Sequence, residues 1–310
     1  MPKIMEILGP LAALGASLTW VAGSSVYTLL AKKYSASTIN FTRASIAFPL
    51  FILVCLFRMD EILPTIDLNS IFFLENICWL ILSVLATYCL GDFLFIWSAL
   101  SVGYPTSQAV GAIYPLWAAI FGVIFLEQPL NIYKYIGIIL SILGIVAVVY
   151  SGRNTKIYYE NSSKSLLRHK STGVLLAIAT SVAWAINGFA VHKAGTAIPV
   201  VFGNVIRMGF AALVCFAIIK FKKGEKSALF LQWSDFKKYG LIFALESFGG
   251  SFLFLYGMSH TPLALGATLS SLAPVIAVPV AVFMRWERFS LLKSLGILIV
   301  MFGVTILVCA

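Results

Sequence analysis

The chain has 310 residues, of which 60 % are hydrophobic and 11 % are charged, and its mean hydropathy is +0.97. A soluble domain carries about 25 % charged residues, so this chain cannot cover a water-facing surface of its own size. Intrinsic disorder is excluded as well, because disordered chains combine low hydropathy with high charge.

Ten apolar segments follow one another along the chain, and each is roughly 19–25 residues long, enough to cross about 30 Å of hydrocarbon as a helix. In chain order they are Ile7–Ala31, Ile39–Phe57, Ile77–Leu100, Pro105–Leu126, Tyr133–Tyr150, Gly173–Ala194, Val200–Ile219, Tyr239–Met258, Leu263–Met284 and Leu291–Cys309. A membrane barrel would instead show alternating strands of about ten residues. The first segment is too long for the apolar region of a signal peptide. The segments therefore predict an all-α polytopic membrane protein with ten transmembrane helices.

The two halves of the chain repeat each other. Trp20 and Arg43 recur 164 positions later as Trp184 and Arg207. The stretch 91–97 recurs 159 positions later as 250–256. This indicates a five-helix repeat over 1–150, a basic linker over 151–171 and a second five-helix repeat over 172–310. Five is an odd number, so the second copy must cross the membrane upside down, as in many secondary transporters with a binding site between the halves.

The basic residues gather on one side of this predicted topology. Of the 22 Lys and Arg, 16 lie in the connections that share a side with the linker, four lie on the other side and two lie inside segments. The positive-inside rule then places the linker in the cytoplasm and both termini outside. The net charge of +10 therefore reports orientation, and we expect no nucleic-acid partner.

Away from the ends of the predicted spans, four charged residues lie where charge is costly and usually functional: Arg43, Asp92, Arg207 and Glu246. Each arginine follows an asparagine by three positions, Asn40 and Asn204, so each pair shares a helix face. One interpretation is a clamp for a substrate carboxylate or phosphate. The others are arginines that reach the headgroups, or structural latches onto the two carboxylates.

The two carboxylates and two prolines of the predicted spans are further functional candidates. Asp92 follows Tyr88 by four positions, and this polar and aromatic face could bind a cationic substrate or a proton. Asp92 and Glu246 align with neutral residues of the other repeat, so neither charge is symmetric. Pro115 and Pro274 interrupt equivalent helices, which predicts either gating kinks with freed carbonyls or simple bent packing.

Enzyme motifs are absent from the sequence. Neither H-E-x-x-H nor G-x-S-x-G occurs, the three histidines do not cluster, and the five cysteines form no C-x-x-C pair. We therefore expect a protein that is not an enzyme and has no cofactor and no metal site. A passive channel and an intramembrane enzyme are the alternatives to a transporter.

An ordered set of residues occurs in both halves and resembles the EamA-type permeases of the drug/metabolite transporter superfamily. In the first half the set is Ala99-Leu-Ser-Val-Gly-Tyr-Pro-Thr-Ser-Gln-Ala109, Tyr114-Pro115, Leu126-Glu127, Gly137 and Gly144. In the second it is Met258-Ser-His-Thr-Pro-Leu-Ala264, Ala273-Pro274, Trp286-Glu287, Gly296 and Gly303. The resemblance covers essentially the whole chain.

This resemblance implies a multi-pass permease of the cell (inner) membrane, with a central cavity between its halves. It implies alternating-access transport of a small metabolite such as an amino acid, with proton coupling as an option. The expected partners are this substrate and the lipid bilayer, and we expect a monomer while leaving oligomers open. The family often has both termini in the cytoplasm, so the orientation stays open. The implied substrate-binding residues are Trp20, Tyr88, Asp92, Tyr114, Trp184, Asn187 and Glu246.

Overall fold

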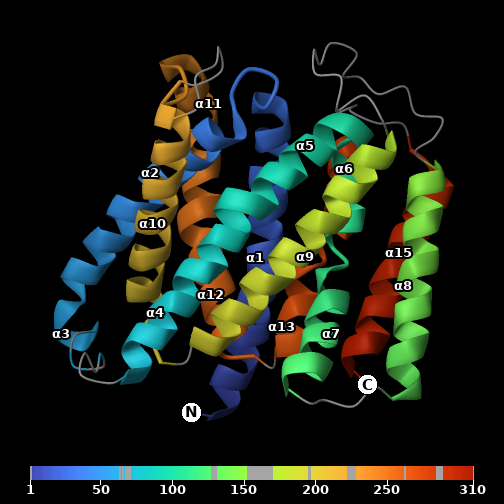
Figure 1. Ribbon diagram of the computed structural model, residues 1–310, viewed down its shortest axis with the longest axis horizontal. Coiled ribbons are helices and arrows are strands. Elements are labelled where there is room, and N and C mark those ends of the chain that lie inside the picture. Colours follow the sequence, from blue (N-terminus) through green and yellow to red (C-terminus); the bar gives the residue numbers. More distant parts are fainter. Residues whose placement is uncertain are drawn as a thin grey trace.

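The protein is a bundle of helices, and no strand occurs among the residues described (Figure 1). The computed structural model describes residues 2–62, 64, 66, 71–126, 131–151, 170–194, 197–221, 228–261, 263–283 and 289–309. Most of the predicted linker, residues 152–169, lies outside these ranges.

The first half begins with α1 (Pro2–Leu30), α2 (Ala36–Phe57) and the short α3 (Met59–Ile62). Ser35 caps α2 by accepting a hydrogen bond from the backbone N–H of Thr38 at 3.1 Å. The next span consists of α4 (Ile71–Val84), the π-helical segment η2 (Leu85–Gly91) and α5 (Asp92–Val102). Gly103 then turns the chain with φ of 86°, a conformation that favours glycine. It leads into α6 (Tyr104–Gly111), α7 (Tyr114–Leu126) and α8 (Ile132–Ser151).

The second half repeats this order with α9 (Lys170–Ala194) and α10 (Val200–Phe221). Then come α11 (Trp233–Ala244), the π-helical η5 (Leu245–Gly250) and α12 (Ser251–Ser259). The chain ends with α13 (Leu263–Ser270), α14 (Ala273–Phe283) and α15 (Leu291–Cys309). The sequence predicts neither π-helical segment. It does predict interruptions by Pro115 and Pro274, and each break lies just before its proline, at residues 112–113 and 271–272.

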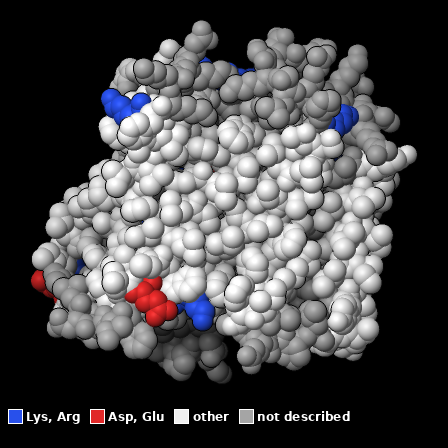
Figure 2. All heavy atoms as spheres, viewed as in Figure 1, with Lys and Arg blue, Asp and Glu red and all other residues white. Residues whose placement is uncertain are grey.

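The surface of the bundle is that of a multi-pass membrane protein. Figure 2 shows a broad band without charged residues between the charged side chains near the two ends. Within the described ranges, six helical stretches have the length and hydropathy of membrane spans: Ile7–Leu30, Ala36–Phe57, Phe73–Val102, Lys170–Ala194, Val200–Phe221 and Trp233–Ser259. Shorter apolar stretches lie in α8 and α15. A soluble protein would not expose so much apolar surface.

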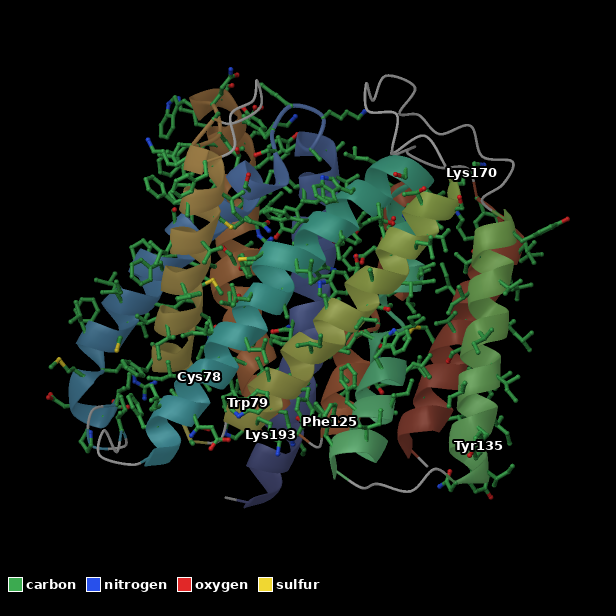
Figure 3. All side chains as sticks on the ribbon, viewed as in Figure 1. Cys78, Trp79, Phe125, Tyr135, Lys170 and Lys193 are labelled. Atoms are coloured by element: carbon green, nitrogen blue, oxygen red, sulfur yellow. The ribbon has the colours of Figure 1, made fainter. Side chains whose placement is uncertain are left out.

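The two ends of the bundle can be followed in the figures. Helix α1 begins and α15 ends at one end of the bundle, whereas the connection from α1 to α2 lies at the other (Figure 1). Lys170 and Lys193, near the two termini of α9, lie at opposite ends (Figure 3). In the α1–α2 connection, Nζ of Lys33 donates a hydrogen bond to Oδ2 of Asp235 at 2.9 Å. This hydrogen bond raises the pKa of Lys33.

Two helix pairings hold the halves together. Helices α8 and α15 pack along each other at one side of the bundle, and α2 packs on α10. The α8–α15 contact is close: a Cβ at Gly303 would lie 2.6 Å from the backbone N of Ser141. The first helix of each half packs mainly against the other half. Helix α1 contacts η5, α12, α13 and α14, while α9 contacts α4, η2, α5, α6 and α7.

Candidate functional site

The bundle contains a partly open cavity with about 760 Å³ of empty space, a figure that includes open solvent. Both halves supply its walls, which combine aromatic rings with a few polar and charged groups. The lining residues are Ala16, Thr19, Trp20, Arg43, Thr87, Tyr88, Gln108, Ala112, Tyr114, Trp184, Asn187, Arg207, Glu246, Gly250, Ser251, Phe254, Ser270, Ser271 and Ala273. A concave, mostly apolar space with a few polar groups is the usual form of a small-molecule site.

Two tryptophans from equivalent positions meet in the cavity wall. The rings of Trp20 and Trp184 contact each other edge to face, with centroids 5.1 Å apart. The indole N–H of Trp20 donates to Oε1 of Gln108 at 3.3 Å. The Gln108 amide in turn donates to Ser24 at 3.0 Å. This wall is therefore held in place by a hydrogen-bonded network that starts at the ring.

Arg43 binds both buried carboxylates. Its Nη1 lies 2.7 Å from Oδ2 of Asp92, and its Nε and Nη2 lie 3.0 and 2.7 Å from the two carboxylate oxygens of Glu246. Asp92 belongs to the first half and Glu246 to the second, so the guanidinium joins the two halves. The latch interpretation of Arg43 therefore describes these contacts, and with 1 % exposure the side chain does not reach toward headgroups.

Aromatic and amide groups complete the surroundings of Arg43. The guanidinium carbon lies 4.0 Å from the ring centroid of Tyr27 and 4.6 Å from that of Tyr88, within the range of cation–π attraction. Asn40 accepts a hydrogen bond from Nη1 at 2.8 Å and donates to the backbone oxygen of Tyr88 at 2.6 Å. Four of the five guanidinium N–H groups therefore have acceptors.

Arg207 occupies the equivalent position in the second half, but its partners are neutral. Its Nε donates to Ser83 at 3.0 Å, Nη1 to Asn204 at 3.1 Å and Nη2 to Asn187 at 3.2 Å. The side chain is 2 % exposed and lines the cavity. Among the residues that the structure describes, Arg207 forms no ion pair. Three of its five N–H groups have acceptors among the described residues.

Most of the residues expected at the site lie around this cavity, and three lie behind its wall. The lining set includes Trp20, Tyr88, Tyr114, Trp184, Asn187 and Glu246, together with both arginines. Asp92, Asn40 and Asn204 do not line the cavity, and each contacts one of the arginines instead.

Each of the two prolines directly follows a residue that lines the cavity. Pro115 follows Tyr114, and Pro274 follows Ala273, both of which line the cavity. The hydroxyl of Tyr114 is hydrogen-bonded to that of Ser270, the last residue of α13. The broken helices of the two halves therefore meet at the cavity.

Sequence reasoning missed several polar residues of the wall. Gln108 lies in the stretch that carries the family resemblance, although nothing in the stretch indicates its contact with Trp20. Thr87 and Ser251 align with Glu246 and Asp92 of the opposite halves. The alignment of the two halves could have indicated Thr87 and Ser251, because each is a neutral residue at a position where the other half has a carboxylate.

The fold and the apolar surface define a polytopic membrane protein with a cavity between its two halves. The sequence model of the EamA-like transporter family matches residues 7–150 and again residues 171–309, so the chain belongs to this family of membrane transporters. A solved structure described as "Crystal structure of protein" shares the fold, with a TM-score of 0.65 and 16 % identity over 96 % of this chain and 95 % of that one. No curated protein gives a significant sequence match. The resemblance read from the sequence is confirmed by the family match.

Proposed function

We propose that the protein is a secondary transporter that carries a small metabolite, such as an amino acid or a related compound, through the cavity by alternating access. The observation that carries the proposal is a partly open cavity in a membrane bundle, walled by residues of both halves. In this proposal the chain crosses the membrane ten times, as two inverted five-helix repeats over 1–150 and 172–310. The position of the α1 start and the α15 end at the same end of the bundle supports an even number of crossings (Figure 1).

The moving parts are the two halves, which rock against each other around the cavity. The broken helices α6–α7 and α13–α14 suit this motion, because a break removes backbone hydrogen bonds and lets the two pieces turn separately. Pro115 and Pro274 keep the breaks from closing, since neither can donate a backbone hydrogen bond. The Tyr114–Ser270 contact joins the breaks and separates when the halves move apart.

Proton coupling follows from the charge balance around Arg43. One guanidinium serves two carboxylates, so this buried cluster carries a net charge of −1 when both are ionised. A proton on either carboxylate makes the cluster neutral. On Glu246 it weakens the ion pair that joins the two halves, and on Asp92 it weakens an ion pair within the first half. In this mechanism Asp92 or Glu246 carries the coupling proton, and protonation favours the rearrangement.

Counterflow in proteoliposomes tests the transporter proposal. Vesicles loaded with an unlabelled compound should take up its labelled form faster than empty vesicles, for at least one member of a panel of amino acids, small carboxylates, amines and nucleosides. Gly249→Ala is a matched control variant, because a Cβ at this position meets no atom within 4 Å. Non-saturable flux without counterflow would indicate a channel, and no flux from either side for the whole panel would contradict the proposal. Conversion of a panel compound would indicate an enzyme.

A further inference from the structure

We infer that Arg207 is the subsite for the carboxylate group of the substrate. The inference rests on the proposed transport function, and it assigns the chemical class of the cargo. It starts from the difference between two arginines at equivalent positions of the two halves, one fully paired with carboxylates and the other with none among the described residues.

The repeat register shows what Arg207 lacks. Arg43 binds Asp92 of its own half and Glu246 of the other half. With the 159-residue offset between the copies, the counterparts of these carboxylates are Ser251 and Thr87. Both line the cavity, and both are neutral hydroxyls. The second arginine has therefore kept its asparagine partner, Asn204, but has no acidic partner at either equivalent position.

A buried guanidinium without a counter-charge is unfavourable, because removal from water costs several kcal/mol that an anion would offset. Asn187, Asn204 and Ser83 orient the group through three hydrogen bonds. One N–H group on each of Nη1 and Nη2 has no acceptor among the described residues, and a guanidinium binds the two oxygens of one carboxylate in a bidentate geometry. Arg207 thus has the orientation and the free donors of an anion site.

The charge of the cavity favours a monoanion over a dianion. Besides Arg207, the cavity is lined by Arg43 and Glu246, which form a cluster with Asp92 of net charge −1 when both carboxylates are ionised. This cluster repels a second negative charge on the ligand, and so the site suits a carboxylate better than a phosphate dianion. The rings of Trp184 and Phe254 form an apolar part of the cavity wall, which can contact the apolar part of the substrate.

Binding to the purified full chain in detergent tests the assignment without any transport step. The probes are L-phenylalanine, benzoate, hexanoate and succinate, each compared with its amide, and phenyl phosphate. Binding is followed by the thermal midpoint and by the fluorescence of the cavity tryptophans. We expect at least one monocarboxylate to bind at least about 10-fold more tightly than its amide and than phenyl phosphate. Arg207→Gln should remove that preference.

A pair of variants keeps Arg207 in place and supplies the missing acid. Ser251→Asp should place a carboxylate in the subsite and weaken carboxylate binding at least about 10-fold more than Ser251→Asn, a neutral side chain of the same size as Asp. Equal binding of acids and amides, tighter binding of phenyl phosphate, or identical binding by the two Ser251 variants would overturn the assignment. Counterflow distinguishes the two proposals. Carboxylate binding through Arg207 without counterflow refutes transport alone, and counterflow that is insensitive to Arg207→Gln refutes the subsite alone.

Discussion

The two buried arginines should differ in what they contribute to stability. Arg43→Met leaves the carboxylates of Asp92 and Glu246 facing the same space without their cation, after the loss of contacts at 2.7 Å to each. Removal of one partner from a buried ion pair costs about 3–5 kcal/mol, because the remaining charge is uncompensated. Here two charges remain, so we expect at least about 4 kcal/mol.

Arg207→Met is the matched control, since the same side chain is replaced at the equivalent position. It leaves three neutral acceptors without a donor, which costs about 1–3 kcal/mol for each truly buried group. It also removes an unpaired buried cation, which offsets that cost. We therefore expect Arg207→Met to lose about 2 kcal/mol or less.

Equilibrium unfolding in mixed micelles of SDS and a mild detergent measures both free energies, with tryptophan fluorescence as the readout. A third variant checks the cause: Arg43→Met combined with Glu246→Gln should regain stability relative to Arg43→Met alone, because one of the two unpaired charges is gone. Equal losses for the two arginine variants, or no recovery in the double variant, would refute the electrostatic reasoning.

Three further outcomes are expected. If the carboxylates carry the coupling proton, Asp92→Asn or Glu246→Gln should abolish uptake driven by a pH gradient in proteoliposomes, and unchanged pH dependence in both would end that mechanism. Gly303→Val should destabilise the protein by about 1–3 kcal/mol because its Cβ would lie 2.6 Å from the backbone of α8, while Gly249→Ala in a thermal melt should match the parent. Tyr34→Phe removes hydrogen bonds of 2.6 and 3.0 Å to the residues at the start of α11, and should lower the unfolding free energy by about 1–3 kcal/mol; a melt identical to the parent would contradict this.

The positions of the six apolar spans could be predicted because membrane insertion depends on properties that one stretch of sequence carries by itself. About 20 apolar residues form a helix in a membrane, and a proline weakens its own helix. Pro115 and Pro274 accordingly lie beside the observed breaks. Pro10 and Pro49 nevertheless lie inside the continuous helices α1 and α2. The π-helical segments η2 and η5 escaped prediction because one extra residue in a turn changes neither hydropathy nor length. Such segments depend on packing against α9 and α1.

The candidate site could be predicted as a set of residues but not as a set of contacts. The cost of a charge in a membrane singled out the four ionisable residues from composition alone. Their pairing depended on which helix of one half lies against which helix of the other. Arg43 and Glu246 are 203 positions apart, and no local pattern reports such a contact. The sequence therefore left latch and ligand open for both arginines, whereas the structure separates them by their partners.

Gly23 provides the room that allows Glu246 to reach Arg43, and this can be tested directly. A Cβ at Gly23 would lie 2.5 Å from Cγ of Glu246 and 2.9 Å from its Cβ, so Gly23→Ala must displace the glutamate. With the 164-residue offset between the two halves, the counterpart of Gly23 is Asn187. This neutral side chain accepts a hydrogen bond from Arg207. Gly23→Ala should therefore weaken the bidentate contact and destabilise the protein in the same direction as Glu246→Gln. A double-mutant cycle with Glu246→Ala, which lacks the nearest atom, should show that the glycine substitution costs less in that background. Strict additivity of the two losses would mean that Gly23 serves only the packing of α1, and the geometric account of the asymmetry between the two arginines would be wrong.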